Sequence, residues 1–343
     1  MVSSEDPKIK PDQNWDLFLK DTSSSFSEKP GSAPVLLLIS GGVDSTVLGA
    51  LLLKTLKSEQ VHLMYMDTGL MRKNESEYVR KVLEKLGAKH IHIISCEKDF
   101  LRALKGKTDP EIKRKTIGDL FIKIQERETK KLDLGADYFL AQGTIYPDVI
   151  ESGSSASSLI KSHHNVGSPL VAAKRKAGLV IEPFEKLYKD GVRSLGRHLG
   201  LEEAIINRHP FPGPGLAVRI LGEVTKEKCN ILRDADAIYI EELKKRKGSS
   251  GKYLYDEIWQ AYAALLPVKS VGIIKEQGGD KRSYGWALVL RAINSTDAMS
   301  AKVYPFQSKD LLEISERITK EVPQINRVVY DISNKPPATI EWE

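Results

Sequence analysis

Short apolar runs alternate with helical segments up to about residue 200. The runs are four to six residues long and bounded by turn residues, which predicts buried strands at 35–39, 61–66, 90–94, 138–141 and 178–181. The helical segments lie at 47–53, 75–87 and 110–132, and from about 190. This alternation is typical of a mostly parallel sheet with helices on both faces. Ligands of such sheets bind beyond the carboxyl ends of the strands, which favours one shared site at the turns 40–46, 67–69 and 142–148.

The pattern changes at residues 209–215, where three prolines and two glycines in seven residues predict a domain boundary. Two helical stretches follow, at about 226–247 and 255–265. Apolar runs at 268–274 and 286–292, a helix at 309–321 and a run at 327–332 complete the chain. Helices and strands that segregate in this way indicate a small α+β domain. Between the two middle runs, residues 275–282 are expected to form a surface hairpin.

The sequence therefore predicts three parts. Residues 1–34, with seven serines and four prolines, are expected to be a flexible tail or linker apart from one or two helical turns at 14–19. An α/β domain follows at 35–208, and the α+β domain occupies 209–343. A length of 343 residues suits two domains that each bury a core.

Composition narrows the class of protein. The net charge of +6 suits anionic small molecules such as nucleotides and is too weak to argue for nucleic acid. Two distant cysteines, Cys96 and Cys229, suggest a reducing compartment and no metal knuckle. No apolar stretch reaches membrane-spanning length and no signal-peptide core is present, so we expect a cytoplasmic protein with no membrane partner.

The segment Ser40-Gly41-Gly42-Val43-Asp44-Ser45-Thr46 is the strongest chemical signal in the chain. A strand, a tight turn of small residues and a helix N-terminus make a phosphate site, because the free N–H groups of the first helical turn point at an anion. Gly41 and Gly42 let the backbone approach a phosphate closely. Asp44 fits an anion cradle when a divalent cation lies between it and the phosphates.

This segment is neither a Walker A loop, which needs a lysine after the glycines, nor a Rossmann G-x-G-x-x-G. It resembles the S-G-G-x-D-S pyrophosphate loop of the ATP-pyrophosphatase superfamily. Enzymes of that superfamily cleave ATP between its α and β phosphates and adenylate a substrate oxygen. The plain alternative is an ordinary capped strand–turn–helix corner.

Four further stretches narrow the resemblance to one family. They are residues 141–152, residues 160–167, the boundary segment 209–219 ending in Arg219, and the C-terminal segment 326–343, which contains Lys-Pro-Pro-Ala-Thr-Ile-Glu. Together with the loop they resemble the glutamine-hydrolysing GMP synthase family over roughly residues 35–343. The resemblance implies an adenine nucleotide alpha-hydrolase-like parallel-sheet domain followed by a small α+β dimerisation domain.

The family reaction is ATP-dependent amination of xanthosine 5′-monophosphate (XMP), with an adenylated intermediate and release of AMP and pyrophosphate. The resemblance implies ATP and Mg²⁺ as cofactors and Asp44 as the metal ligand. The expected catalytic residues are Asp44, Lys189 and Asp148. The residues expected to bind ATP are Ser40, Gly41, Gly42, Val43, Asp44, Ser45, Thr46, Asp67, Gly69 and Gly143. Taken alone, Asp148 reads as a turn residue and Lys189 as a helix-cap lysine.

The resemblance places the XMP site on the helix at 110–132 and on the C-terminal segment. The residues expected to contact XMP are Arg114, Gln260, Arg327, Lys335, Ile340 and Glu341. Arg114 matches an arginine of the family's mobile lid, although Lys113-Arg114-Lys115 alone reads as a solvated helix face. The C-terminal segment alone reads as a docked last strand. Lys161 is a weaker phosphate candidate, and His163 and His164 are expected to be structural.

Glutaminase chemistry is not expected in this chain. Only the 34-residue tail precedes the domain that carries the loop, and neither cysteine lies in a nucleophile-elbow context. We therefore expect ammonia to be free or supplied by a separate glutaminase subunit. A homodimer follows from the family alone. The alternatives are another adenylating synthetase such as an NAD synthetase, a tRNA-modifying enzyme, or a non-catalytic nucleotide-binding regulator. The C-terminal segment argues against the first and the absence of a cysteine pair against the second.

Overall fold

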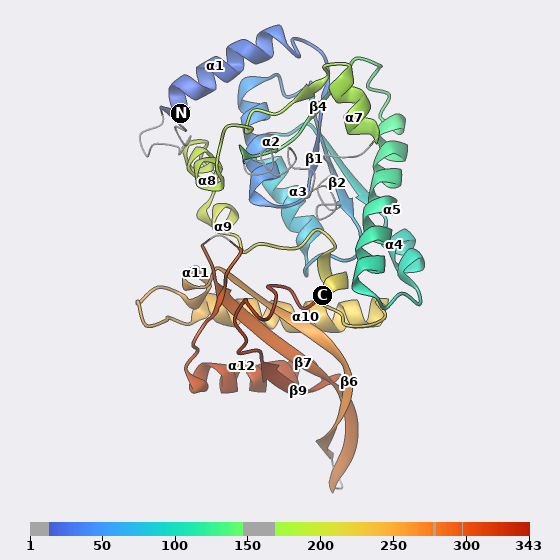
Figure 1. Cartoon of the computed structure of the whole chain (residues 1–343), viewed down its shortest axis with the longest axis vertical. Helices are drawn as coiled ribbons and strands as arrows, with labels where there is room; N and C mark the ends of the chain where they lie inside the picture. The colour runs from blue at the N-terminus through green and yellow to red at the C-terminus, as the bar shows by residue number, and fades with distance from the viewer. Residues whose placement is uncertain (1–13, 147–168, 277–278, 297) are drawn as a thin grey trace, which may run out of the picture. The chain divides into compact units, whose positions relative to one another are not determined.

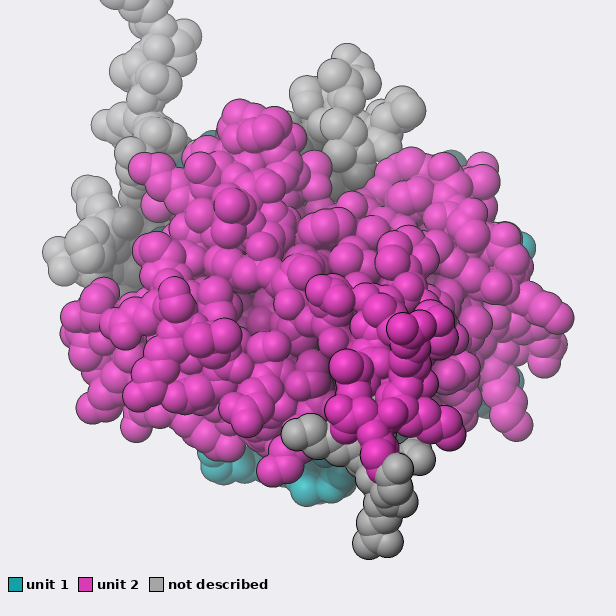
Figure 2. All heavy atoms as spheres, turned by 90° about the horizontal axis from the view of Figure 1, so that it is seen from below, with its two compact units in different colours: residues 1–67, 74–96, 118–208 teal, residues 68–73, 97–117, 209–343 magenta. Residues whose placement is uncertain are grey.

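The computed structural model describes residues 14–146, 169–276, 279–296 and 298–343 (Figure 1). The chain divides into two compact units, which Figure 2 colours separately. The first unit comprises residues 1–67, 74–96 and 118–208, and the second comprises residues 68–73, 97–117 and 209–343. The second unit therefore includes two short segments that precede residue 209.

The first unit contains a five-stranded parallel sheet of order β3-β2-β1-β4-β5. Its strands are β1 (Val35–Ile39), β2 (Val61–Asp67), β3 (His90–Ser95), β4 (Phe139–Ala141) and β5 (Val180–Ile181). The expected parallel α/β sheet is confirmed. The central strands β1 and β4 are apolar and largely buried, as parallel strands covered on both faces require, whereas the edge strand β3 is part-buried.

Helices cover both faces of this sheet. On one face, Gly49 of α2 (Val43–Thr55) lies against Leu37, Ile39 and Leu63, and α2 also packs on α8 (Lys189–His198). On the other face, a core cluster joins the strands to Val171 of α7 (Pro169–Lys176). This unit also contains α3 (Glu75–Lys85), the later part of α5 (Pro110–Lys131) and α9 (Glu203–Ile206).

The N-terminal segment is more ordered than the sequence suggested. Residues Trp15–Glu28 form α1, a helix of 14 residues capped by the Asn14 side chain. Thr22 and Phe26 are buried, and the Trp15 indole donates to Ser194 Oγ of α8 at 3.1 Å. A flexible tail was therefore the wrong expectation for residues 15–28. Widely spaced apolar residues are enough to dock a helix when they share one face.

The second unit is an α+β structure, as expected. Its main sheet places β7 (Gly279–Asn294) between β6 (Gln260–Glu276) on one side and β8 (Lys302–Val303) and β9 (Ile325–Tyr330) on the other. Helices α10 (Lys226–Lys245) and α12 (Ser308–Glu321) accompany it, together with α4 (Glu97–Leu104), α11 (Leu254–Glu257) and the 3₁₀ helix η2 (Gly215–Val218).

The predicted helix at 255–265 is wrong. Only α11 is helical there, and β6 begins at Gln260. Residues 261–264 are fully buried, paired with β7 on one edge and packed against α10. Helix-favouring alanines can serve as strand residues here because tertiary packing outweighs intrinsic propensity.

The expected surface hairpin is confirmed. Strands β6 and β7 remain paired antiparallel as far as Glu276 and Gly279. Val271, Ile273 and Tyr284 are exposed on it. No helix among the residues described is long and apolar enough to cross a membrane.

Three histidines stack at one edge of the parallel sheet. The ring of His62 on β2 lies 4.4 Å from that of His90 and 5.4 Å from that of His92, both on the edge strand β3. His62 Nδ1 is 3.2 Å from His92 Nε2. Burial, followed by the charges of the neighbouring imidazoles, lowers the pKa of His62 to about 4. Burial, followed by the charge of His90, also lowers the pKa of His92, so the fold favours the neutral forms of His62 and His92.

The turn from β1 into α2 has a sterically restricted glycine. Gly41 has φ +78°, and a Cβ built on it would lie 2.9 Å from Glu75 Oε1 and 3.3 Å from Val79 Cγ2. An L-residue is strained in this conformation and also lacks room. By contrast Gly87, which follows α3, has a similar φ of +81° and nothing within 4 Å of its built Cβ.

The histidine cluster should make stability depend on pH. The folded pKa of His62 lies below its ordinary value of 6.5, so the unfolded chain binds more protons between pH 6.5 and 4. The free energy of unfolding should therefore be level above pH 6.5 and fall as pH drops towards 4. His62→Gln should reduce this loss by on the order of 1 kcal/mol, allowing for solvent screening.

Denaturant unfolding at pH 7.5 and 5.0 measures the effect. The matched control is His198→Gln on α8, outside the cluster, which should not reduce the loss. Equal acid losses in wild type and His62→Gln would contradict this account.

Gly41→Ala should destabilise the protein more than Gly87→Ala. Both variants carry the strain of a positive φ, about 1–2 kcal/mol, and only Gly41→Ala also displaces the Glu75 side chain. Chemical denaturation gives the two free energies of unfolding. Equal losses would mean that Glu75 moves away at no cost, against the packing described here.

Candidate functional site

The loop 40–46 lies at the topological switch point of the parallel sheet. Strand β1 has β2 on one side and β4 on the other, so the crossover directions diverge at this position. The loop leaves β1 there, and Gln142-Gly143-Thr144 leaves β4 beside it. A Cβ built on Gly143 would lie 3.7 Å from the main-chain carbonyl of Asp44. Two of the three turns nominated from the sequence are thus brought together.

Hydroxyl groups brace the loop from within. Ser45 Oγ accepts from the Ser40 N–H at 3.2 Å and donates to the Gly42 carbonyl at 3.2 Å. Thr46 Oγ1 donates to the same carbonyl at 2.9 Å, and the Gly42 N–H donates to Ser40 Oγ. No side chain caps α2 at Gly42. The N–H groups of Val43, Asp44 and Ser45 have no acceptor within the helix, so this N-terminus suits an anion.

Asp44 and Lys189 stand at the N-termini of two helices that pack together. Lys189 Nζ of α8 lies 3.9 Å from Asp44 Oδ2 of α2, and their side chains are 47% and 30% exposed. A pair so long and exposed is weak. Both groups therefore remain accessible to a charged ligand in the first unit.

An arginine that the sequence analysis missed holds the loop from outside. Arg208 Nη1 donates to the Gly41 carbonyl at 2.8 Å, and Arg208 Nη2 donates to Glu75 Oε2. Both side chains of this ion pair are largely buried. The loop conformation thus depends on residues from α3 and from the end of the first unit. The signal available in the sequence was that Arg208 is a charged residue directly before the Pro-rich boundary segment.

The other residues expected to bind ATP do not all lie in the unit that carries the loop. Asp67 ends β2 in the first unit, where its Oδ2 accepts from Ser76 Oγ at 2.7 Å. Gly69 belongs to the second unit, and its carbonyl accepts from Arg233. Asp148 lies outside the described residues, as do Lys161, His163 and His164.

A second missed group follows β4 and β5 in the first unit. Glu182 Oε1 accepts from Thr144 Oγ1 at 2.6 Å and from Arg175 Nη2 at 2.7 Å. Glu182 comes directly after β5, at the same edge of the sheet as the loop. Glu182 directly follows a predicted strand, and this position could have indicated that it lies at the carboxyl edge of the sheet.

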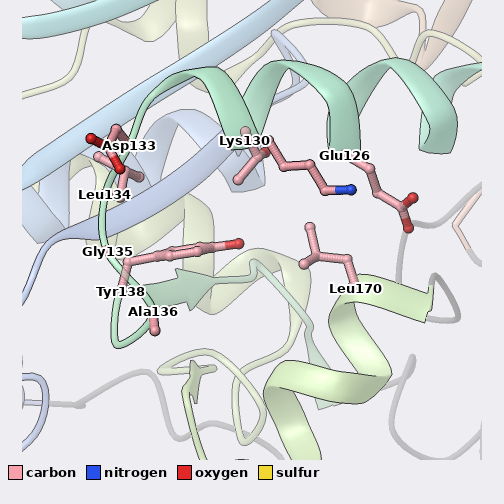
Figure 3. A pocket seen from close by; sticks show the side chains of 9 residues that line it. Glu126, Lys130, Asp133, Leu134, Gly135, Ala136, Tyr138 and Leu170 are labelled. Carbon is pink, nitrogen blue, oxygen red and sulfur yellow. The ribbon is translucent and has the colours of Figure 1, made fainter.

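The first unit also has a cavity that is not at this edge. It has a volume of about 590 Å³ and lies between α5, α7 and the residues before β4 (Figure 3). Tyr138, which lines it, precedes β4 and so marks the amino end of that strand. The cavity therefore lies away from the carboxyl edge that carries the loop.

In the second unit, a buried guanidinium fixes Glu341. Arg219 is fully buried and donates through Nε and Nη2 to the two oxygens of Glu341 at 2.9 and 2.8 Å. Its guanidinium also lies 4.1 Å from the ring centroid of Tyr262 and 4.9 Å from that of Phe211. Burial opposes the charge of Arg219, but Glu341 outweighs it and the pKa of Arg219 is raised.

Gln260 completes this arrangement. Its Nε2 donates to Glu341 Oε1 at 2.7 Å, so two predicted substrate residues meet. Gln260 Oε1 and Arg219 Nη1 are buried without a hydrogen-bond partner. One acceptor and one donor beside a carboxylate can recognise a heterocyclic edge that offers both kinds of group.

The main chain before Glu341 is also held. The Ile340 carbonyl accepts from the Tyr262 hydroxyl at 2.8 Å and from Arg291 Nε at 3.0 Å. Arg291, fully buried, also donates to the Thr339 carbonyl and to Asp331 Oδ2, both at 2.7 Å. Arg291 was missed, although a charge inside the predicted apolar run 286–292 was a visible signal.

Three other expected substrate residues have separate partners. Arg114, part-buried on α5, pairs with Glu111 one turn earlier. Arg327, exposed on β9, donates to Ser270 Oγ at 2.9 Å. Lys335 Nζ donates to the Ala298 carbonyl at 2.8 Å. These contacts do not join any of the three to Glu341.

No cluster of three His, Cys, Asp or Glu side chains forms a metal-ligand set within the described ranges. Cys96 and Cys229 are buried and not in disulfides, and burial raises the pKa of Cys229 to about 11. A thiol buried in this way is a poor nucleophile.

Two family models match parts of the chain. Residues 248–342 match the GMP synthase C terminal domain. Residues 30–108, which include the loop, match the model described as asparagine synthase.

Curated relatives match nearly the whole chain. A GMP synthase (glutamine-hydrolyzing) of Bdellovibrio bacteriovorus is 52% identical over 312 residues, or 90% of this chain and 58% of that protein. Those of Bartonella henselae and Prochlorococcus marinus are 49% and 48% identical, over 96% and 98% of this chain and 61% and 62% of theirs. Among solved structures, an NH3-dependent NAD synthetase from Campylobacter jejuni gives a TM-score of 0.41 at 17% identity, covering 57% of this chain and 77% of that one.

The chain thus spans about three fifths of the length of the curated relatives that it matches. The match to the C-terminal domain model separates it from other proteins with a similar loop. On these grounds the chain corresponds to the synthetase part of GMP synthases, with a loop region that matches the asparagine synthase model followed by the GMP synthase C terminal domain.

Proposed function

We propose that this chain catalyses ATP-dependent amination of XMP to GMP, a ligase reaction of purine biosynthesis that forms a C–N bond. The balanced reaction converts XMP, ATP and ammonia into GMP, AMP and pyrophosphate. One observation carries the proposal. Asp44 and Lys189 meet at a phosphate-binding loop in a chain whose later residues match the GMP synthase C terminal domain.

In this proposal the loop binds the β and γ phosphates of ATP. The N–H groups of the first turn of α2 face the pyrophosphate, and the Ser40, Ser45 and Thr46 hydroxyls keep the loop in shape. Lys189 supplies positive charge as the bond between the α and β phosphates breaks. Gly143 leaves room beside Asp44, and Asp67, Gly69 and Asp148 are assigned to the same ATP site.

The residues present fit Mg²⁺. This ion is commonly held by one or two carboxylates together with substrate phosphates. Asp44 offers a part-exposed carboxylate at the phosphate end of α2, so Asp44 would hold the ion. When bound, Mg²⁺ neutralises charge on the departing pyrophosphate.

The C-terminal segment would hold XMP. Glu341, whose two carboxylate oxygens accept hydrogen bonds from Arg219, is a suitable acceptor for an N–H edge of the base. Gln260 and the Ile340 segment would complete the base site, while Arg114, Arg327 and Lys335 would meet the phosphate. The C2 oxygen of XMP attacks the α-phosphorus, pyrophosphate leaves, and ammonia then displaces AMP.

The remaining assignments belong to the same proposal. Ammonia is free or delivered by a separate glutaminase, and the protein is a cytoplasmic homodimer. The loop domain extends over 35–208 and the dimerisation and substrate domain over 209–343.

The purified chain with Mg-ATP should release pyrophosphate only when XMP is present. With ammonium chloride it should form GMP, and with glutamine alone it should not. Chelation of Mg²⁺ should stop both pyrophosphate release and GMP formation. Pyrophosphate release without XMP, or no release under any condition, would overturn the proposed function.

Lys189→Met should lower the rate of pyrophosphate release by about 10²–10³-fold, because a charge that stabilises the transition state is lost. The matched control is Lys186→Met, an exposed lysine one turn earlier, which should stay within about twofold of wild type. Similar rates for the two variants would remove Lys189 from its assigned role.

A further inference from the structure

We propose that Lys113 and Glu343 form a buried clamp that holds the C-terminal segment against the first turn of α5. Lys113 is thereby a positioning residue for the XMP site, acting through Glu343 and its own helix. The role in XMP binding rests on the proposed function. The clamp itself is formed by contacts within the second unit.

Lys113 is an unusual lysine because its side chain is fully buried. Its ammonium group donates to Glu343 Oε2, to the Ile220 carbonyl at 2.8 Å and to the Ala217 carbonyl at 3.3 Å. Three acceptors match the three N–H donors of an ammonium group. A solvated helix face, the plain expectation from the sequence, is therefore wrong for Lys113.

Glu343 is held from a second direction. Its Oε1 accepts from the Gly222 N–H at 3.2 Å, and its side chain is only 8% exposed. Lys113 and Glu343 thus share one segment, residues 217–222, as their common support. Burial lowers the pKa of Lys113, and the Glu343 carboxylate opposes that effect.

The same segment also carries Arg219, which fixes Glu341. Glu341 and Glu343 are two residues apart, and both reach back to residues 217–222. Two carboxylates anchored to one support fix the register of the main chain between them. A shift of this segment by one residue would break both pairs.

The clamp reaches the substrate residues through the adjacent main chain. Arg114 directly follows Lys113 on α5, whose start is fixed by Asp109 Oδ1 accepting from the Ile112 N–H at 2.9 Å. Removing Glu343 would leave a buried ammonium group without its counter-charge. The first turn of α5 and the C-terminal segment would then loosen together, and Arg114 and Glu341 would lose their registered positions.

Hydrogen exchange on the full chain tests the clamp without substrate. Glu343→Gln should speed exchange of the Ala338 amide, which donates to the Asn334 carbonyl, and of the α5 amides 113–117 by about tenfold or more, because local order protects hydrogen-bonded amides. The control is Glu313→Gln, which removes a carboxylate partner of Arg246 elsewhere in the second unit. It should leave the exchange of these amides unchanged.

Kinetics of GMP formation from ammonium chloride test the positioning role. Glu343→Gln and Lys113→Met should each raise the KM for XMP by about tenfold, while the KM for ATP stays within about twofold. A double variant should cost no more than either single change, since the two residues act as one unit. General destabilisation would move both KM values.

The outcomes separate the two proposals. If wild type makes no GMP, the proposed function fails, and hydrogen exchange still decides whether the clamp exists. If wild type is active but Glu343→Gln leaves exchange and the KM for XMP unchanged, the clamp is overturned. Should Lys113→Met fail to fold, Glu343→Gln alone decides.

Discussion

The second unit depends on neutralising cations that it buries completely. Lys113, Arg219 and Arg291 are all inaccessible to solvent. Each finds a carboxylate in residues 331–343: Glu343, Glu341 and Asp331 respectively. A buried charge without a partner is costly, whereas a paired and fully hydrogen-bonded one is tolerated. The C-terminal segment therefore supplies the carboxylates that neutralise the buried cations of this unit.

The first unit depends on a different constraint, the shared direction of its strands. Because every strand is parallel, their carboxyl ends lie at one edge, and the order β3-β2-β1-β4-β5 places the topological switch point at β1. Helix N-termini with Asp44 and Lys189 meet there. The backbone topology thus brings together polar groups from distant parts of the sequence, and no strong interaction between their side chains is needed.

The sequence was most informative where local pattern and tertiary role agree. Buried parallel strands are predominantly apolar, so β1 and β2 were recognisable, and the small residues of the loop predicted an anion site there. The sequence was least informative where tertiary contacts decide the secondary structure or the role of a residue. Residues 260–265 look helical but pair with β7, and residues 15–28 form a docked helix. Arg208 and Lys113 gain their roles only from partners 133 and 230 residues away, a distance that no local pattern encodes.

The packing around Gly41 constrains the order in which this loop can change during evolution. The space that a side chain at position 41 would need is occupied by the Glu75 carboxylate, and that carboxylate is paired with Arg208. A substitution at Gly41 therefore meets a steric obstacle until Glu75 is shortened. Shortening Glu75 first leaves Arg208, mostly buried, without its counter-charge. The three positions form an epistatic set in which each single step is worse than the start, so relatives should keep all three or exchange them together.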